Sequence, residues 1–269
     1  MLENPRSPRV RRVAALKKKS ERRDSGLFLL EGPQSLREAL NFTPELLVEV
    51  FATPSELEKH RDIAKSLSTQ GIEPEFISEE VLAAMSETVT PQGFVAVCKQ
   101  FPTALKDVCA ATPRLVVILE EVRDPGNAGT ILRAADAAGA DAVIFSGRSI
   151  DIYNPKVVRS TTGSLFHLPH ARVEQAVDAV TALRALGVQV LAADISGNDL
   201  TEVRADGRLQ KPTAWLFGNE ARGLDAETLA LADLAVRVPI FGYAESLNLA
   251  TAASVCLYES AFEQRARSV

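Results

Sequence analysis

Several features that define other classes of protein are absent from this chain of 269 residues. Its three cysteines, Cys98, Cys109 and Cys256, are widely separated and form no CxxC or CxH pair. An odd, scattered set of cysteines argues against a disulfide framework and is typical of a reducing compartment. It also argues against a structural zinc site, so we expect no metal.

Long hydrophobic runs are also missing. No apolar stretch reaches the roughly 18–20 residues that span a bilayer, and no hydrophobic signal segment follows the basic N-terminus. We therefore expect a cytoplasmic protein without a membrane contact. Because no Gly-x-Gly-x-x-Gly motif follows an apolar strand, the sequence disfavours an oxidoreductase that binds a dinucleotide.

Acidic residues are scarce among the first 23 residues, although the whole chain carries a formal net charge of −5. This stretch holds nine lysines and arginines against Glu3 and Glu21, a net charge of +7 that leaves −12 for the remainder. A basic arm on an acidic body indicates contact with a polyanion, with nucleic acid as the first candidate. The alternative is a solvated tail, and composition alone does not separate the two.

The first hundred residues alternate between strand-like and helix-like segments. The predicted strands are short apolar segments at residues 27–31, 46–52, 72–77 and 94–98. The predicted helices lie between them, at about residues 9–23, 33–40, 54–66 and 78–85. This alternation predicts a small α/β domain over residues 1–103. Residues 104–113 show no periodicity and end in a proline, which predicts a linker.

Residues 114–269 contain five continuous apolar runs. These are residues 115–119, 142–145, 188–192, 214–217 and 235–238. Strands buried on both faces have this composition, so we predict an α/β domain with a parallel sheet covered by helices. The helical patterns fall at about 128–138, 173–186, 226–232 and from Leu247 onward. Ligands bind beyond the carboxyl ends of such strands, which directs attention to the loops there.

The first of these loops contains Asp124-Pro125-Gly126-Asn127 and leads into a helical pattern that includes Arg133. Pro125 and Gly126 form a turn signal, and Asn127 is predicted to cap the helix. Arg133 follows nearly two helical turns later. Taken singly, these residues are also explained by a capped helix with a surface arginine.

A second loop, Gly218–Leu224, has glycines on both sides of Asn219-Glu220-Ala221-Arg222, directly after an apolar run. We expect Gly218 to let a ligand approach the backbone and Gly223 to permit a left-handed bend. A plain turn needs fewer special residues than this. The composition of the loop therefore favours a functional role.

A third loop ends in Glu245 and Ser246, either of which is predicted to cap the helix that follows. That helix begins with Asn248, a polar residue among leucines, and continues with the small residues of 250–254. Small side chains let another backbone approach closely, which predicts a packed partner helix. Asn248 is harder to explain, because its amide needs partners wherever its neighbours are buried.

Taken in order, the three loops resemble the motifs of one enzyme family, the SpoU (TrmH-like) branch of the SPOUT RNA methyltransferases. The matching residues are Asn127 and Arg133, then Phe217-Gly218-Asn219-Glu220 with Gly223-Leu224, then Val238-Pro239-Ile240 with Ser246-Leu247-Asn248. Each motif alone is weak, whereas the ordered set is specific. The resemblance covers about residues 114–264.

The N-terminal region resembles the RNA substrate-binding domain found in rRNA-modifying members. The matching segments are Lys17-Lys18-Lys19, Gly26–Gly32 and Thr90-Pro91-Gln92-Gly93. Many relatives carry a histidine before Gln-Gly where this chain has Thr90-Pro91, which leaves the role of that loop open. The predicted RNA contacts are Arg9, Arg12, Lys17, Lys18, Lys19, Arg22 and, by its position in the family, Arg159.

The resemblance implies a parallel sheet with a trefoil knot, a homodimer with the catalytic site between subunits, and S-adenosylmethionine as cofactor. By position, the implied cofactor contacts are Gly218, Val238, Ile240 and Leu247. The implied reaction is methylation of a ribose 2′-hydroxyl in RNA, most simply 23S rRNA. Transfer RNA is an alternative substrate, and a non-catalytic RNA-binding assembly factor is an alternative function.

The resemblance assigns the chemistry to Arg133, with Asn127, Glu220, Ser246 and Asn248 as residues that orient it and the ribose. An arginine with a pKa above about 12 is a poor base. Our hypothesis is therefore that Arg133 pairs with a phosphate and stabilises the developing alkoxide. His167 and His170 lack a paired carboxylate or metal spacing in the sequence, which favours structural roles for both.

Overall fold

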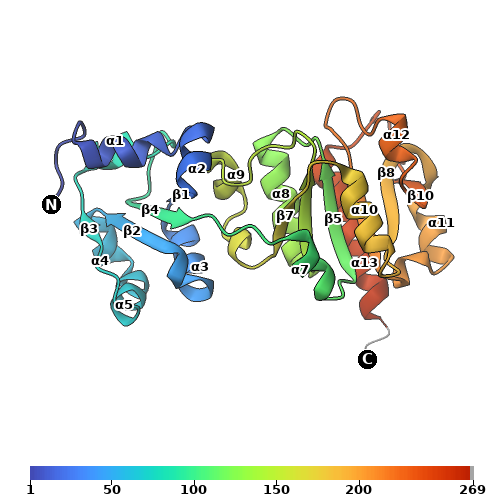
Figure 1. Ribbon diagram of the computed structural model, residues 1–269, viewed down its shortest axis with the longest axis horizontal. Helices are drawn as coiled ribbons and strands as arrows, with labels where there is room; N and C mark the ends of the chain where they lie inside the picture. Colours follow the sequence, from blue (N-terminus) through green and yellow to red (C-terminus); the bar gives the residue numbers. More distant parts are fainter. Residues whose placement is uncertain (267–269) are drawn as a thin grey trace. The chain divides into compact units, whose positions relative to one another are not determined.

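The computed structural model describes residues 1–266, and the chain divides into two compact units (Figure 1). The N-terminal unit contains Met1–Phe101 and also Asp151–His167. The C-terminal unit contains Pro102–Ile150 and the described residues from 168 onward. No feature of the sequence predicted that residues 151–167 pack with the N-terminal unit, because they lie between two strands of the other unit.

The N-terminal unit is built on a four-stranded sheet with the strand order β1-β4-β2-β3. The strands are β1 (Leu27–Glu31), β2 (Leu47–Ala52), β3 (Glu75–Phe76) and β4 (Phe94–Lys99). β4 pairs antiparallel with β1 and β2, whereas β2 and β3 are parallel. All four predicted strands are therefore confirmed, although β3 is shorter than predicted.

Seven α-helices and two short 3₁₀ segments complete the described part of this unit. They are α1 (Pro8–Ala15), α2 (Lys19–Ser25), α3 (Pro33–Phe42), η1 (Pro44–Leu46), α4 (Pro54–Lys59), α5 (Arg61–Thr69), α6 (Glu79–Met85), α9 (Pro155–Ser160) and η2 (Ser164–Phe166). The single helix predicted over residues 9–23 is wrong, because the chain breaks between α1 and α2. Arg22 stabilises the break by donating to the carbonyl oxygens of Leu16 and Lys17, at 2.9 and 2.8 Å.

The basic N-terminal segment is part of the fold rather than a free tail. Val10 and Val13 of α1 are buried in the core, and Arg9 and Arg12 form ion pairs with Glu49 at 2.9 and 3.0 Å. Arg22 is only 1% exposed and pairs with Asp151 at 2.7 Å. The prediction that Arg22 contacts RNA is therefore corrected, since its guanidinium is enclosed and holds the unit together.

The C-terminal unit contains a six-stranded sheet with the order β10-β8-β9-β5-β6-β7, in which every pairing is parallel. The strands are β5 (Leu115–Glu120), β6 (Ala142–Ser146), β7 (His170–Arg172), β8 (Gln189–Asp199), β9 (Thr213–Phe217) and β10 (Leu234–Arg237). The five predicted strands are confirmed. β7 was missed because it has three residues and contains a histidine and an arginine.

Helices cover both faces of this sheet. They are α7 (Leu105–Ala110), α8 (Pro125–Ala138), α10 (Ala176–Arg184), α11 (Leu200–Ala205), α12 (Ala226–Leu229) and α13 (Leu249–Arg265), with the 3₁₀ segment η3 (Arg208–Gln210). Figure 1 shows α10 in front of the sheet and α13 behind it, and α13 packs on α8. The covered strands are buried on both faces, as their apolar sequences predicted.

The segment predicted to be a linker, residues 104–113, largely forms α7. Its Val108 is 3% exposed and joins the core formed by α10 and the sheet. A helix of six residues with one buried position gives no detectable period, which is why the sequence pattern failed here. The two family-like regions are thus joined by a structured segment that belongs to the C-terminal unit.

Both histidines singled out in the sequence have structural partners. His167 Nε2 lies 3.2 Å from Glu38 Oε2 within the N-terminal unit. His170 begins β7, and its Nδ1 lies 3.3 Å from the carbonyl oxygen of Leu168. Burial lowers the pKa of His170 to about 4, so the ring is neutral in the folded protein.

Candidate active site

The first polar loop is fixed by the start of α8. Asp124 caps this helix, because its Oδ1 accepts a hydrogen bond from the Asn127 backbone N–H at 2.7 Å, and Pro125 occupies the first turn. The prediction that Asn127 is the cap is therefore wrong. Asn127 lies in the first turn instead, and its side-chain amide is left to bind elsewhere.

Glu220 connects the second loop to the first. Its carboxylate accepts hydrogen bonds from the backbone N–H of Arg123 at 3.2 Å and of Asp124 at 2.9 Å. It also accepts from the Asn127 side-chain amide at 3.5 Å. Since a carboxylate with several N–H donors is held firmly in place, Glu220 fixes the position of the loop before α8.

Within the second loop, Asn219 and the two glycines form a tight turn. Asn219 and Gly223 exchange backbone hydrogen bonds at 3.1 and 2.8 Å, and Gly223 has a φ of +66°, as predicted. A Cβ on Gly218 would lie 2.4 Å from the Gly223 carbonyl carbon. Gly218 is therefore required by the close approach of its own loop, and its predicted contact with the cofactor stays a prediction.

The third loop leads to Asn248, which caps α13. Its Oδ1 accepts from the backbone N–H groups of Ala250 and Thr251, at 2.9 and 3.3 Å. The expected caps, Glu245 and Ser246, lie three and two residues before Asn248, so that prediction is wrong. The side-chain amide of Asn248 donates to Asn127 Oδ1 at 3.0 Å. Asn248, Asn127 and Glu220 thus form a chain of hydrogen bonds that joins all three loops.

A pocket with a volume of about 330 Å³ lies beside these hydrogen-bonded side chains. Val238, Ile240 and Leu247, three of the four predicted cofactor contacts, line it, together with Glu220 and Ser246. Gly218 is not among the lining residues, although its neighbours in residues 219–223 are. The pocket therefore combines an apolar wall with a polar rim and backbone groups.

Sequence reasoning missed part of this lining. Residues 193–195, at the carboxyl half of β8, and Leu249 and Ala252 of α13 also border the pocket. Asp194 fixes the local backbone by accepting from the Ser196 N–H at 2.9 Å and from its hydroxyl at 2.6 Å. The composition of this segment is ordinary, so the sequence singled out none of its residues.

Arg133 is a predicted catalytic residue that one copy of the chain does not bring to the pocket. It is exposed on α8, six residues beyond Asn127, which places it about 240° around the helix and about 9 Å along it. It is not among the residues that line the pocket. The other predicted catalytic residues, Asn127, Glu220, Ser246 and Asn248, lie in or directly beside the pocket.

Residues 1–266 contain no cluster of three or more histidine, cysteine, aspartate or glutamate side chains arranged to hold a metal ion. Among the same residues, none of the helices has both the length and the apolar character needed to cross a membrane.

Two family models match the chain. The SpoU rRNA methylase family matches residues 114–258, and the RNA 2′-O ribose methyltransferase substrate-binding family matches residues 29–104. The 23S rRNA (guanosine(2553)-2′-O)-methyltransferase RlmP of Bacillus subtilis is 36% identical over 258 residues, which cover 96% of this chain and 97% of that protein. The 23S rRNA (uridine(2479)-2′-O)-methyltransferase of Streptomyces viridochromogenes is 32% identical, covering 95% and 93%.

Solved structures agree with these matches. The AdoMet-bound rRNA methyltransferase from Sinorhizobium meliloti superimposes with a TM-score of 0.82 at 31% identity, covering 100% of this chain and 98% of that one. The SpoU methyltransferase AviRb from Streptomyces viridochromogenes, in complex with AdoMet, also gives 0.82, at 30% identity and with coverages of 97% and 100%. On this evidence, the chain belongs to the SpoU rRNA methylase family.

Proposed function

We propose that this chain is a cytoplasmic enzyme that methylates a ribose 2′-hydroxyl of structured RNA, with 23S rRNA as the substrate. The observation that carries the proposal is the convergence of Asn127, Glu220 and Asn248, from three separate loops, beside one apolar pocket. The names of the full-length relatives support the choice of ribosomal over transfer RNA.

The pocket beside these residues fits S-adenosylmethionine, the cofactor in the two solved relatives. Val238, Ile240 and Leu247 offer an apolar wall for an adenine ring, and the turn at residues 219–223 offers backbone hydrogen bonds. The cofactor has no phosphates, so it needs no glycine-rich phosphate loop. When bound, it supplies an electrophilic methyl group on a sulfonium ion.

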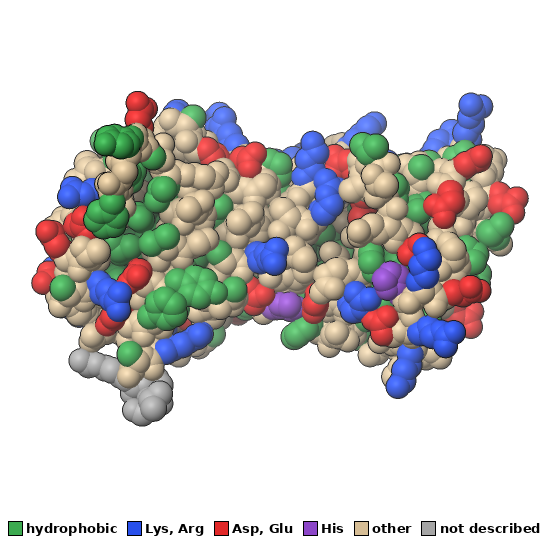
Figure 2. Space-filling view, turned by 180° about the vertical axis from the view of Figure 1, so that it is seen from behind, with side chains coloured by type: hydrophobic (Ala, Val, Ile, Leu, Met, Phe, Trp, Pro, Cys, Tyr) green, Lys and Arg blue, Asp and Glu red, His purple; other side chains and the backbone are tan. Residues whose placement is uncertain are grey.

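We further propose that two copies of the chain pair through α13. Val255, Tyr258 and Phe262 are 36%, 38% and 57% exposed and lie on one side of this helix, at spacings of three and four residues. Phe241 and Tyr243, in the loop before it, are almost fully exposed. Figure 2 shows hydrophobic side chains gathered on this face of the C-terminal unit. Such a surface is typical of a protein interface.

Pairing of two chains supplies the missing arginine. Because Arg133 lies outside the pocket of its own chain, we propose that it serves the pocket of the second copy. Because the chain belongs to the SpoU family, we also propose the trefoil knot of that family. In it, residues 239–248 are threaded past the loop at 218–224. The pocket lining supports this arrangement, since both segments border it.

The residues of this chain then divide the chemical work. Arg133 holds a phosphate next to the target ribose and stabilises negative charge on the 2′-oxygen as its proton passes to solvent. The 2′-oxygen bonds to the methyl carbon while the bond from that carbon to sulfur breaks, and S-adenosylhomocysteine leaves. Asn127, Ser246 and Asn248 orient the ribose, and Glu220 holds the loop that positions Asn127. Placing oxygen and methyl in line can lower the barrier by roughly 7–11 kcal/mol in the best cases.

The N-terminal unit is proposed to bind the RNA. Lys18, Lys19 and Arg159 are exposed, and their side chains form no hydrogen bond or ion pair within residues 1–266, so they are available for phosphates. Lys17 is half-buried and donates to the Ala84 carbonyl at 2.8 Å, and burial lowers its pKa. Arg9 and Arg12 remain exposed but share Glu49, which weakens their expected contribution.

The proposal is tested by methyl transfer from labelled S-adenosylmethionine to unmodified 23S rRNA and to total transfer RNA. We expect label in 23S rRNA, recovered after alkaline hydrolysis as a dinucleotide that resists cleavage because its 2′-oxygen is blocked. Binding of S-adenosylmethionine without transfer to either RNA would instead support the non-catalytic assembly factor. Label in transfer RNA alone would overturn the choice of substrate.

A further inference from the structure

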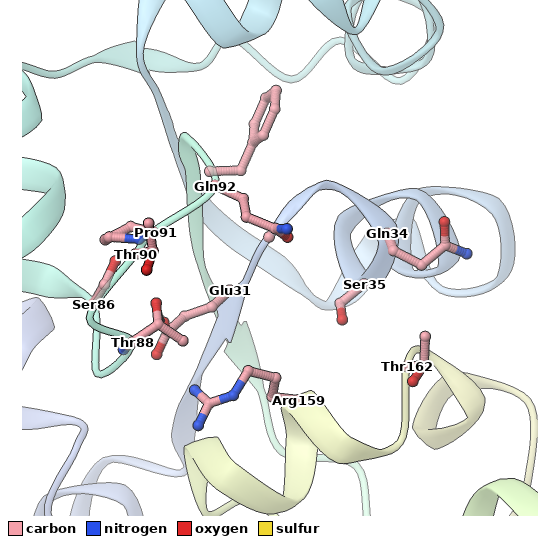
Figure 3. Close-up of a pocket in the computed structure, with 12 residues that line it drawn as sticks. Glu31, Gln34, Ser35, Ser86, Thr88, Thr90, Pro91, Gln92, Arg159 and Thr162 are labelled. Carbon is pink, nitrogen blue, oxygen red and sulfur yellow. Dashed lines mark hydrogen bonds between the residues drawn. The ribbon is translucent and has the colours of Figure 1, made fainter.

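The N-terminal unit contains a second pocket, which we call the Ser86 pocket, with a volume of about 330 Å³ (Figure 3). It is bordered by the β1–α3 turn at Glu31 and Gly32, the loop from Ser86 to Gln92, and Arg159 of α9. All of these residues belong to the N-terminal unit. None of the roles proposed above for the methyl-transfer site uses this pocket.

Ser86 gives the first reason to expect a ligand here. The residue is 6% exposed, and its hydroxyl has no hydrogen-bond partner among the residues that the structure describes. Buried polar groups in native proteins are almost always hydrogen-bonded, so an orphaned hydroxyl calls for an explanation. Because Ser86 borders the pocket, a ligand there can supply the missing partner.

The walls of the Ser86 pocket are held in place before any ligand binds. The Glu31 carboxylate accepts hydrogen bonds from the Glu87 N–H at 3.0 Å and from the Thr88 hydroxyl at 3.0 Å. Gly32 has a φ of +88°, and a Cβ at this position would lie 3.0 Å from Gln92 Oε1. The missing side chain at Gly32 therefore leaves room beside the Gln92 amide.

The chemical groups around the pocket match a nucleotide. Gln92 is exposed, and its amide has no hydrogen-bond partner within residues 1–266, so it can offer both a donor and an acceptor. Figure 3 shows the Arg159 guanidinium on the side of the pocket where Glu31 and Thr88 lie. Neutral hydrogen-bonding groups suit the edge of a base, and a free guanidinium suits a phosphate.

The volume of the Ser86 pocket limits the size of the ligand that it can hold. Sites for small molecules usually have volumes of roughly 300–1,000 Å³, so 330 Å³ holds one nucleotide but no paired helix. Sequence-specific RNA recognition generally uses unpaired bases that are turned outward and hydrogen-bonded along their edges. A pocket of this size therefore selects an unpaired nucleotide.

We propose that the Ser86 pocket binds one unpaired nucleotide of the substrate RNA. The base edge bonds to the Ser86 hydroxyl and the Gln92 amide, and Arg159 binds the adjoining phosphate. This proposal rests on the proposed function, because it deepens how the N-terminal unit recognises RNA. It also gives a role to the loop at Thr90-Pro91-Gln92, which the sequence left open.

The test compares Ser86→Ala with Thr43→Val in the full-length chain. Thr43 Oγ1 is the other buried hydroxyl that lacks a partner among the described residues, and it lies outside the pocket. Unmodified 23S rRNA is the probe in filter binding, and a blunt RNA duplex is the non-specific reference. We expect Ser86→Ala to weaken binding to the rRNA by roughly threefold to tenfold, with no change on the duplex.

Two further results are expected. Thr43→Val should bind both RNAs as the parent does, and chemical footprinting should show an unpaired nucleotide that the parent protects and Ser86→Ala exposes. Equal binding of rRNA by Ser86→Ala and the parent overturns the proposal, as does equal loss on rRNA and duplex. If either of these results is found and the parent still methylates 23S rRNA, the pocket proposal has failed while the proposed function stands.

Discussion

The two units each carry a pocket of about 330 Å³, and the two pockets differ in how their polar groups are satisfied. In the C-terminal unit, Glu220, Asn127 and Asn248 already bond to one another or to backbone N–H groups. In the N-terminal unit, Ser86 has no partner within the described residues. The polar groups of the first pocket are paired before a ligand arrives, whereas the hydroxyl in the second pocket gains its partner from a ligand.

This difference matches the two tasks. Chemistry needs groups that stay in position while charge develops, so that no reorganisation is required during the reaction. Recognition depends on the penalty that unpaired polar groups suffer when the wrong ligand binds. Substitutions in the two pockets should therefore have different effects on methyl transfer, on stability and on ligand binding.

Replacing Arg133 should affect chemistry more than any other change. Arg133→Ala should lower the initial rate of methyl transfer by about 100-fold to 1,000-fold, because the developing negative charge loses its partner. Arg133→Lys should retain part of the rate, since an ammonium group keeps the charge but not the two-pronged geometry. Titration calorimetry should show unchanged cofactor binding in both. Near-parental rates in both variants would exclude this role for Arg133.

Replacing Glu220 tests whether the C-terminal pocket depends on its preformed hydrogen bonds. Glu220→Gln places an amide N–H₂ against the N–H of Arg123, which bonds to both carboxylate oxygens, and we expect a loss of about 10-fold to 100-fold in methyl transfer. The affinity for rRNA should stay unchanged. Glu202→Gln, at an exposed position on α11, is the matched control. A parental rate in Glu220→Gln would contradict the account of this loop.

The free energy of unfolding should distinguish a buried serine whose hydroxyl is hydrogen-bonded from one whose hydroxyl has no partner within the described residues. Ser260 accepts a hydrogen bond from Trp215 Nε1 at 2.8 Å, so Ser260→Ala leaves a buried N–H unpaired and should cost about 1–3 kcal/mol of unfolding free energy. Ser86→Ala removes a hydroxyl that has no partner within the described residues and should cost almost nothing.

Unfolding of the two units has to be followed separately, because a chain of two units need not unfold in one step. Trp215 is the single tryptophan, so its fluorescence in urea reports on the C-terminal unit, and circular dichroism follows both. A large loss of stability in Ser86→Ala would mean that its hydroxyl already has a partner in the free protein.

Shortening Leu247 should have the smallest effect, and it should change cofactor binding where Ser86→Ala changes RNA binding. Leu247→Ala removes part of the apolar wall and should weaken binding of S-adenosylmethionine by about threefold to tenfold. Binding of rRNA should not change. Ser86→Ala should show the opposite pattern in the same two assays. Loss of both affinities in either variant would show that the two pockets are not independent.

The sequence predicted most of the C-terminal sheet because its central strands are buried on both faces and read as unbroken apolar runs. It failed on β7, which is short and polar, and on the two helix caps. Asp124 and Asn127 are both good capping residues, and only the course of the backbone decides between them. The same ambiguity placed the cap of α13 at Glu245 or Ser246 instead of Asn248.

The Ser86 pocket was beyond sequence reasoning for a different reason. It joins Glu31, a loop some sixty residues later, and Arg159, which follows strands of the other unit. No local pattern reveals that Asp151–His167 returns to the N-terminal unit. The missing partner of Ser86 is likewise a property of its surroundings and not of its residue type.

Mixing two inactive variants tests most directly whether Arg133 of one copy serves the pocket of the other. One carries Arg133→Ala, and the other carries Leu247→Arg, which fills the cofactor pocket. If the arginine of one copy serves the pocket of the other, half of randomly mixed dimers contain one intact site of two. The mixture should then recover about a quarter of the parental rate of methyl transfer to 23S rRNA. No recovery, with mixed dimers confirmed by differently tagged copies, would contradict the shared site.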